Sequence, residues 1–336
     1  MLQFLRKKKR IGFIVENALP YHQAMASTRL RCYDVINYLN KNSYQAEVYR
    51  CNHQYDVVIF QKCFRQKHYE LANKIKQQGI SVVLDININI VEEYGDVSAI
   101  FNGDQLESIK RQRSDLKKFL QITDHVLVSS LVLLESYRKY HTSVFCIEEI
   151  VTDNFFRKRK LHQAKNLVTL LYVGYAIKAV ELEIIREVLN ELYNKYQVEI
   201  LFVSDQPPDI NVGNVPTQFR CYNQKILSDL LLQSDIKLAP RDLKNQYNVG
   251  HSFTKVAYPM AVGLPVVASP VPSYLNREVI VCREAEDWYV RLEELIKDHN
   301  LRNYYGARGS SFVKNNFAPE AIGKQYSSLL NLLAKQ

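Results

Sequence analysis

The stretch GHSFTKVAYPMAVGLPVVAS, residues 250–269, reads as a short helix followed by a buried strand. Lys255 falls in the first predicted turn, and Gly263 follows the last one. The N–H groups of a helix's first turn, together with a lysine, favour a bound anion such as a phosphate. Pro259 removes a helical hydrogen bond at a cost of about 3 kcal/mol, and such a departure often marks a functional site. The stretch predicts a phosphate-receiving βα unit, and the alternative is an ordinary βα unit with a solvated lysine.

Short apolar runs alternate with helical periodicity along most of the chain. Continuous apolar strands between helices are typical of parallel sheets covered on both faces, so we expect an α/β protein with doubly wound parallel sheets. Ser27 and Ser252 are the predicted N-caps of two helices, and Gly79 is a predicted C-cap. Strands are expected at 11–15, 46–50, 55–60, 81–86, 125–130, 143–147, 167–174, 198–205, 219–223, 235–240, 266–270 and 279–282, and helices at 27–41, 68–79, 106–123, 131–141, 179–196, 224–233, 285–298, 300–315 and 318–334.

The alternation breaks near residue 150, where a charged stretch has no periodicity. A chain of 336 residues suits about two domains. We therefore expect an N-terminal Rossmann-like domain at 1–155 and a C-terminal one at 156–316, with the final helix, 317–336, packing back on the first. Ligands of such sheets bind at the carboxyl ends of the strands, which predicts a site in the cleft between the two domains.

Composition and charge narrow the setting. The formal net charge of +9 favours phosphates, nucleic acid or an anionic membrane surface as partners. Six cysteines at irregular spacing, without a CxxC pattern, predict reduced thiols in the cytoplasm. No apolar run reaches the roughly 18 residues of a membrane-spanning helix. The basic residues of MLQFLRKKKR, residues 1–10, follow its apolar ones, so we expect a solvated tail, or attachment to anionic lipid at the inner membrane face, rather than a secretory signal.

The segment DIKLAPRDLKNQYNVGHSFTKVAYPMAVGLPVVASPVPSYL, residues 235–275, resembles the donor-binding half of retaining glycosyltransferases with two Rossmann-like domains, the GT-B type. In LLYVGYAIKAVELEIIREVL, residues 170–189, Gly174 matches the family's turn glycine and Lys178 its phosphate-binding lysine. AMASTRLRCYDVINYL, residues 24–39, is similar to a helix after the first strand in one subgroup. The matching positions of the first segment are Asp235, Pro240, Asn248, Ser252, Lys255, Met260, Ala261, Gly263, Pro265 and Ser269.

This resemblance implies transfer of a sugar from a nucleotide-sugar, with retention, to a polysaccharide, glycolipid or other glycan. Cations and helix N–H groups suit the leaving diphosphate, whose charge grows in the transition state. The implied catalytic residues are Lys178, Lys255 and His22, although a histidine in the loop after the first strand is more often simply solvated. The implied donor-binding residues are Gly174, Tyr175, Pro240, Asn248, His251, Ser252, Phe253, Thr254 and Tyr258, and the acceptor-side residues are Ser27, Arg29 and Asp85. No DxD motif is placed to bind the donor, so no metal is expected, and the nucleotide-sugar is a co-substrate rather than a cofactor.

Several positions depart from the family pattern. Two glutamates that contact sugar and ribose hydroxyls are replaced by Gly250 and Tyr258, an arginine by Tyr175, and a lysine by His251. A tyrosine offers one hydroxyl where a carboxylate accepts two, so ribose recognition must differ.

Four function classes therefore stay open. The first is a glycosyltransferase with a glycan or lipid-linked acceptor, and the second is a non-catalytic scaffold or regulator with the same fold. The third is a sugar-nucleotide epimerase, for which Asp85, Glu92 and Glu93 are the available acids. A nucleic-acid binder comes last, because the basic residues are spread over many helices and no RNP, KH or zinc pattern appears; nucleic acid is not an expected partner.

Overall fold

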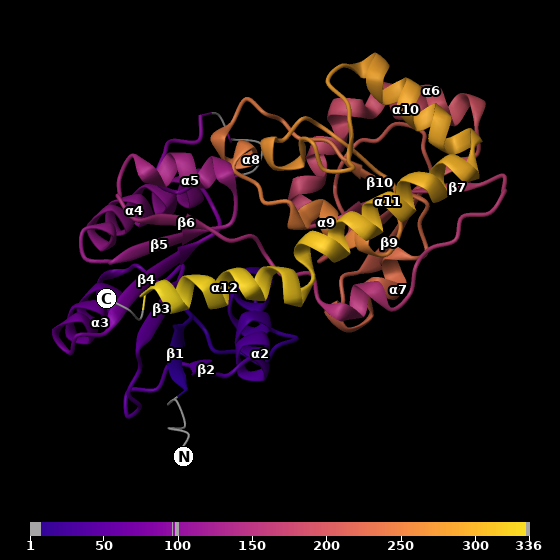
Figure 1. Ribbon diagram of the computed structural model, residues 1–336. Helices are drawn as coiled ribbons and strands as arrows, with labels where there is room; N and C mark the ends of the chain where they lie inside the picture. Colours follow the sequence, from indigo (N-terminus) through magenta and orange to yellow (C-terminus); the bar gives the residue numbers. More distant parts are fainter. Residues whose placement is uncertain (1–7, 96, 98–100, 334–336) are drawn as a thin grey trace, which may run out of the picture. The chain divides into compact units, whose positions relative to one another are not determined.

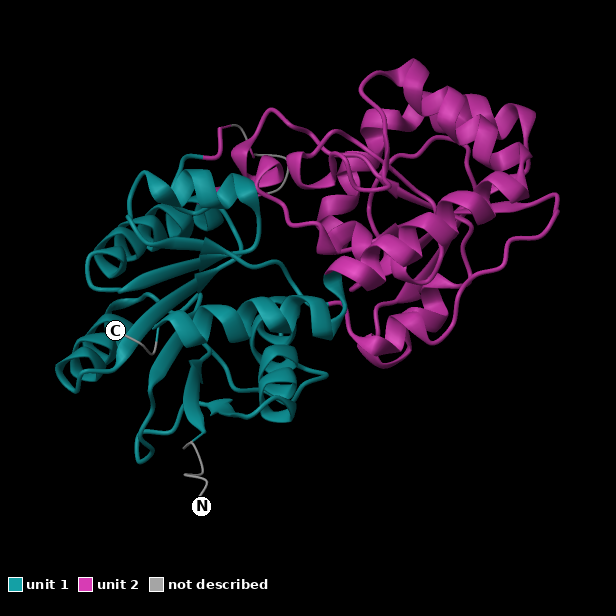
Figure 2. Cartoon of the chain, viewed as in Figure 1, with its two compact units in different colours: residues 1–93, 104–150, 317–336 teal, residues 94–103, 151–316 magenta. Residues whose placement is uncertain are grey.

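The computed structural model describes residues 8–95, 97 and 101–333. It forms two compact units (Figure 2), unit 1 with residues 1–93, 104–150 and 317–336, and unit 2 with residues 94–103 and 151–316. Each unit has one six-stranded sheet with helices beside it (Figure 1). The predicted α/β class with two doubly wound parallel sheets is confirmed. No pattern in the sequence indicates the short excursion of residues 94–103 into unit 2.

The sheet of unit 1 has the strand order β2-β1-β3-β4-β5-β6, and each neighbouring pair is parallel. Its central strands are buried along most of their length, as their continuous apolar sequences predict. The strands are β1 (Lys9–Ile14), β2 (Tyr44–Val48), β3 (Val57–Gln61), β4 (Ser81–Ile86), β5 (His125–Val128) and β6 (Val144–Cys146).

One helix of unit 1 comes from the far end of the sequence. Helix α12 (Pro319–Leu333) packs against α2 (Asp34–Lys41), where Gly323 faces the ring of Tyr38. A Cβ atom at Gly323 would lie 2.3 Å from that ring, so only glycine allows this approach. The other helices are α1 (Ala26–Thr28), the π-helix η1 (Arg29–Tyr33), α3 (Gln66–Gln77), α4 (Gly103–Leu120) and α5 (Leu131–Arg138).

The sheet of unit 2 has the strand order β12-β11-β10-β7-β8-β9, again all parallel. Counted from its first strand this is the 3-2-1-4-5-6 order of dinucleotide-binding folds, whose topological switch point lies here between β7 and β10. The strands are β7 (Val168–Val173), β8 (Val198–Ser204), β9 (Thr217–Cys221), β10 (Ile236–Ala239), β11 (Val266–Ala268) and β12 (Ile280–Val281).

The helices of unit 2 differ from expectation at two places. The predicted helix 179–196 is divided into a 3₁₀ segment, η3 (Ala176–Ile185), and α6 (Arg186–Lys195), and a short helix, α8 (Gln246–Val249), stands where a loop was expected. The remaining helices are η2 (Asp153–Phe156), η4 (Gln224–Ile226), α7 (Leu227–Leu231), α9 (Thr254–Ala261), η5 (Pro272–Tyr274), α10 (Ala285–Lys297) and α11 (His299–Phe317).

The structure confirms one predicted cap and corrects two. Gly79 ends α3 with φ of 74° and a pair of backbone bonds typical of a Schellman motif, so the C-cap is confirmed. Ser27 is no N-cap, because the helix already begins at Ala26. Ser252 is no N-cap either: Phe253 precedes α9 and its carbonyl accepts the first helical bonds. The fully buried ring of Phe253 fixes that start one residue later than predicted.

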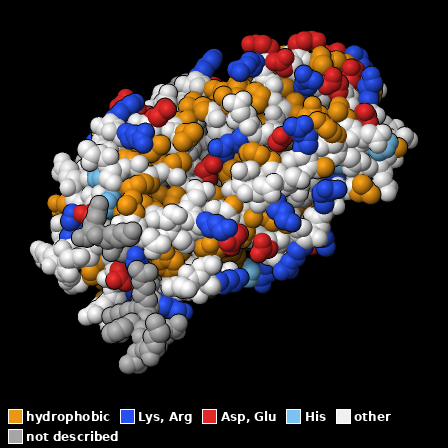
Figure 3. Space-filling model, viewed as in Figure 1, with side chains coloured by type: hydrophobic (Ala, Val, Ile, Leu, Met, Phe, Trp, Pro, Cys, Tyr) orange, Lys and Arg blue, Asp and Glu red, His pale blue; other side chains and the backbone are white. Residues whose placement is uncertain are grey.

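The described residues include no helix that is both long and apolar enough to cross a membrane. On the face shown in Figure 3, lysine and arginine side chains lie among acidic and apolar ones. The first seven residues, which carry much of the basic N-terminal stretch, lie outside the described residues.

We predict that Gly323→Ala destabilises the protein. An exposed helical glycine gains up to about 1 kcal/mol on replacement by alanine, but here the new methyl group meets the buried Tyr38 ring. Overpacking should lower the free energy of unfolding by about 1–3 kcal/mol in urea denaturation. The exposed neighbour Lys324 supplies the control, Lys324→Ala, which should change it by less than about 0.5 kcal/mol. A stabilised Gly323→Ala protein would contradict the packing of α12 on α2.

Candidate anion-binding site

The topological switch point of unit 2 brings two loops together. The segment after β7 begins at Gly174, and the segment after β10 begins at Pro240. These strands are parallel neighbours and the chain leaves them toward opposite sides, and ligands of such sheets generally bind at the carboxyl ends of strands placed in this way. Helix α9, which follows β10 and α8, completes this edge of the sheet.

The loop after β7 turns tightly and delivers Lys178. A Cβ atom at Gly174 would lie 3.0 Å from the hydroxyl of Tyr172, so a side chain there would disturb the turn. The N–H of Ala176 donates to Oδ1 of Asp205 at 2.8 Å, which fixes the start of η3 to the end of β8. Lys178 lies in the first turn of η3 and is half-buried.

The loop after β10 is held to η3 by a buried carboxylate. Glu181, 4% exposed, forms an ion pair with Nη1 of Arg241 and accepts a bond from Nδ2 of Asn248 at 2.6 Å. Asn245 caps α8 by accepting the N–H of Asn248 at 2.8 Å. Glu181 therefore orients both Arg241 and Asn248, and it joins the two segments that flank the switch point.

Tyr247 links Lys178 to His251. The ammonium group of Lys178 lies 4.2 Å from the centroid of the Tyr247 ring and donates to its hydroxyl. Burial raises the pKa of Tyr247 to about 12, so the phenol stays protonated. The backbone carbonyl of Tyr247 lies 2.9 Å from Nδ1 of His251. Because a carbonyl only accepts, Nδ1 carries the proton and Nε2 of the neutral ring has the lone pair.

Four basic side chains lie near His251 or near one another, and we name them the cation cluster. They are Lys178, Lys237, Arg241 and Lys255. Burial, and then the charges of Arg241, Lys178 and Lys255, hold the pKa of His251 well below its usual value. Burial, and then Arg241 and Lys255, likewise hold the pKa of Lys237 far below its usual range. An anion would relieve these mutual repulsions, and within the described residues the buried carboxylate of Glu181 pairs with Arg241 of the cluster. The arrangement is therefore a candidate anion-binding site.

Most of the predicted donor-binding residues lie on the three segments that meet here. They are Gly174, Tyr175, Pro240, Asn248, His251, Ser252, Phe253 and Thr254, together with the predicted catalytic Lys178 and Lys255. Tyr258 lies on α9 as well, and its ring stacks on Phe155 with centroids 4.1 Å apart. Phe253 contributes only backbone, since its side chain is fully buried against Tyr274 and Phe312.

Sequence reasoning missed Glu181, Arg241, Tyr247 and Lys237. Glu181 falls within the predicted helix 179–196, and nothing in its spacing distinguishes it from a solvated carboxylate. Arg241 had a usable signal, since it directly follows a strand that ends at the predicted site. Lys237 sits inside an apolar strand, where a lone lysine is unusual enough to have been noticed.

The residues predicted for the acceptor side lie in unit 1. His22 is exposed, and its ring lies 5.7 Å from that of Tyr21. Arg29 is buried and donates to the carbonyl of Ala24. Asp85 is fully buried and accepts from Nε of Arg31 at 3.0 and 3.1 Å. Ser27, near the start of α1, is half-buried. Arg29 and Asp85 thus have partners inside the unit.

Comparison with protein-family models found no match, and comparison with curated proteins found none either. Solved structures are similar over most of the chain. Sucrose-phosphate synthase from Thermosynechococcus elongatus superposes with a TM-score of 0.66 at 14% identity, covering 97% of this chain and 99% of that one. An alpha-glucosyltransferase in complex with UDP gives 0.64 at 11% identity, covering 96% and 99%. TarM gives 0.61 at 12% identity, covering 82% of this chain and 54% of TarM. The chain therefore has the GT-B fold of these glycosyltransferases, as the resemblance predicted.

We predict that Glu181→Ala strongly destabilises unit 2. The substitution leaves the guanidinium of Arg241, whose side chain is 8% exposed, buried without its counter-charge. Loss of one partner of such a pair costs about 3–5 kcal/mol in the free energy of unfolding. The double variant Glu181→Leu/Arg241→Met should recover most of this loss. Glu187→Ala on α6, where the side chain is 83% exposed, is the control, and an equal loss there would refute the assignment.

Asp34 gives a prediction for pH. Burial raises its pKa to about 7, although the Tyr21 hydroxyl donates to Oδ1 at 2.9 Å and Arg29 opposes the shift. In the unfolded chain the carboxyl has its ordinary pKa of 3.8, so the folded state alone is protonated between these values. This contribution is present below the unfolded value and is lost as pH rises to about 7. The stability of Asp34→Asn relative to wild type should therefore rise across this window in urea denaturation, and a difference that stays constant with pH would contradict the burial of Asp34.

Proposed function

We propose that the protein is a glycosyltransferase that moves a sugar from a nucleotide-sugar to a glycan or lipid-linked acceptor with retention of configuration. Two observations support this. The fold is that of glycosyltransferases, including one solved with UDP and one with UDP-glucose and DNA. The cation cluster lies at the switch point of unit 2, where a nucleotide's phosphates bind in related sheets. The cluster is the single observation that carries the proposal.

The cluster suits the departure of a nucleoside diphosphate. As the bond to the sugar breaks, negative charge grows on the diphosphate oxygens, and preorganised cations stabilise that charge without reorganising. Lys178 and Lys255 supply direct contacts, while Arg241 is oriented by Glu181. Because these side chains neutralise the leaving group themselves, the proposal includes no metal and no cofactor at the donor site.

The donor's hydroxyls need acceptors other than the carboxylates that Gly250 and Tyr258 replace. Oδ1 of Asn248 is buried and has no hydrogen-bond partner within the described residues. Nε2 of neutral His251 has a lone pair, as the bond at Nδ1 requires. Glu181 is unsuited, because its oxygens already pair with Arg241 and Asn248. We assign hydroxyl recognition to Asn248 and His251.

A non-catalytic scaffold remains the second candidate, favoured by the loss of carboxylates at Gly250 and Tyr258. We do not propose an epimerase, since Glu92 is engaged by Lys139 at 2.5 Å and Ser136 at 2.9 Å. A cytoplasmic location, with contact to anionic lipid through the basic N-terminal stretch, is part of the proposal.

The decisive measurement is calorimetric titration with UDP, other nucleoside diphosphates and their sugar conjugates, with uridine alongside. Lys178→Ala and Lys255→Ala should each weaken diphosphate binding about tenfold or more, the loss of a charge-assisted hydrogen bond. Binding of the free nucleoside should change little. Lys297→Ala, an exposed lysine on α10, is the matched control and should bind as wild type does.

Turnover then separates the two candidates. A wild-type protein that binds a nucleotide-sugar and forms a product with the donor's anomeric configuration, read by NMR, supports the enzyme. Binding without transfer to glycan, lipid-linked or DNA acceptors supports the scaffold. Failure to bind any nucleoside diphosphate would overturn the assignment of the site.

A further inference from the structure

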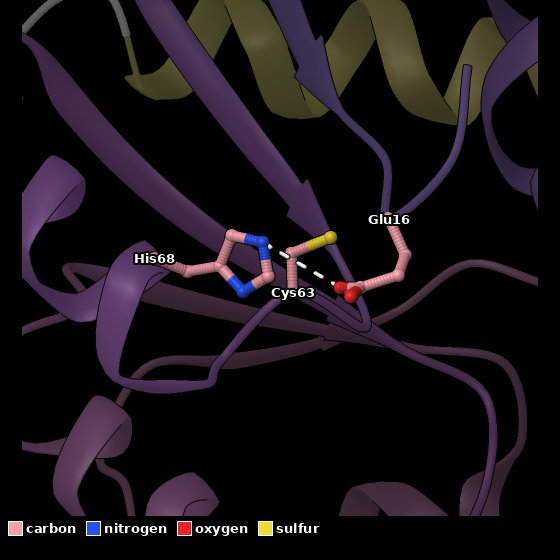
Figure 4. A group of neighbouring side chains, drawn as sticks. All are labelled: Glu16, Cys63 and His68. Atoms are coloured by element: carbon pink, nitrogen blue, oxygen red, sulfur yellow. Dashed lines mark ion pairs between the residues drawn. The ribbon is translucent and has the colours of Figure 1, made fainter.

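Three side chains of metal-binding type meet at the carboxyl edge of the unit 1 sheet (Figure 4). Glu16 follows β1, Cys63 follows β3, and His68 lies in the first turn of α3. Glu16 and Cys63 are 47 residues apart in sequence, and Cys63 and His68 are 5 apart, so no short sequence motif predicts the group. The sequence predicts no metal because it has no DxD motif at the donor site and no CxxC pattern. Neither pattern applies to Glu16, Cys63 and His68.

The group stands at the topological switch point of its sheet. β1 lies between β2 and β3, and the chain passes from β1 to β2 on one side before it continues with β3 on the other. The loops after β1 and β3 therefore diverge, and the space between such loops is where ligands enter open α/β sheets. The position alone does not identify a ligand, but the side chains that fill it are chemically specific.

Their geometry is close to that of a bound metal. One ligand atom from each residue lies within 4.8 Å of the other two, and Nε2 of His68 is 3.5 Å from Oε2 of Glu16. Ligands of a tetrahedral zinc ion lie about 3.5 Å from each other, given bonds of about 2.0–2.3 Å. Cys63 and His68 are 0% and 6% exposed, whereas Glu16 is exposed. A small movement of the exposed carboxylate would close the site around two fixed ligands.

The two buried ligands are not otherwise satisfied. Within the described residues Cys63 is in no disulfide, and Nδ1 of His68 is buried without a hydrogen-bond partner, while Nε2 is the ring nitrogen that lies next to Glu16. The residue before the cysteine, Lys62, has φ of 55°, a left-handed conformation that is uncommon for a side-chain-bearing residue. Its N–H donates to the carbonyl of Asp85 at 2.9 Å, which holds the turn. Strain of this kind, about 1–3 kcal/mol, is typical of ligand clamps.

We propose that Glu16, Cys63 and His68 bind Zn²⁺, with water as the fourth ligand. A thiolate, an imidazole and a carboxylate form a borderline set that suits zinc rather than magnesium or calcium. Binding releases the thiol proton of Cys63 to solvent, and the metal then joins the loops after β1 and β3. Arg65 and Lys67 each lie 3.4 Å from the Glu16 carboxylate and compete with the metal for it. This proposal does not depend on the proposed function.

The test uses the full chain, reduced and freed of metal, with the exposed thiols Cys51 and Cys221 replaced by serine. Titration with Co²⁺, a spectroscopic substitute for Zn²⁺, should produce a thiolate-to-cobalt charge-transfer band with one metal per chain, and Zn²⁺ should abolish it. Cys63→Ser should eliminate the band, and His68→Gln should weaken binding about 10–100-fold or more. Lys67→Gln should strengthen it, because a competing cation is removed. Cys282→Ser, which alters a buried thiol of unit 2, should behave as the parent does.

Thermal unfolding in the presence of a chelator tests whether Cys63→Ser loses the metal only because the variant is misfolded. Cys63→Ser should then unfold at the same temperature as the parent, and only the parent should gain stability when Zn²⁺ is added. Absence of the charge-transfer band in the parent, or a band that survives Cys63→Ser, would overturn the proposal. In that case Glu16 and His68 form an ordinary ion pair beside a buried thiol.

Discussion

The buried pair of Glu181 and Arg241 is the constraint on which the candidate site depends. The pair joins η3, which follows β7, to the loop after β10. The carboxylate of Glu181 therefore connects the two segments that flank the switch point. The same carboxylate orients Asn248. Without the negative charge of Glu181, the guanidinium of Arg241 would be buried beside other basic side chains without its counter-charge, which is unfavourable. The pair therefore permits a local excess of positive charge that a folded protein otherwise avoids.

Burial and that excess of positive charge together explain why the pKa values of His251 and Lys237 are lowered. His251 stays neutral because burial and three neighbouring cations all oppose a further charge, and Lys237 loses basicity for the same reason. The ammonium group of Lys178 lies over the ring of Tyr247 and donates a hydrogen bond to its hydroxyl. Both interactions stabilise this cation beside the other cations.

The fold was predictable from the sequence, whereas the interactions that organise the candidate site were not. Strand and helix periodicity identified the two parallel sheets, and the segment from Asp235 to Leu275 indicated the edge where Lys255 lies. Periodicity cannot separate a buried glutamate from a solvated one, so Glu181 was missed. The caps at Ser27 and Ser252 were wrong because burial of neighbouring side chains, as at Phe253, decided where each helix begins. The group of Glu16, Cys63 and His68 depends on strand order, which no local pattern encodes.

The interleaved course of the chain has a consequence for biosynthesis. The chain passes from one unit to the other at residues 93–94, 103–104, 150–151 and 316–317. Helix α12, whose Gly323 fits against Tyr38, is made only after all of unit 2 has been translated. During synthesis, the face of α2 that packs against α12 therefore stays uncovered until unit 2 has been translated. Because neither unit is one continuous segment, no single cut in the chain separates the two units intact.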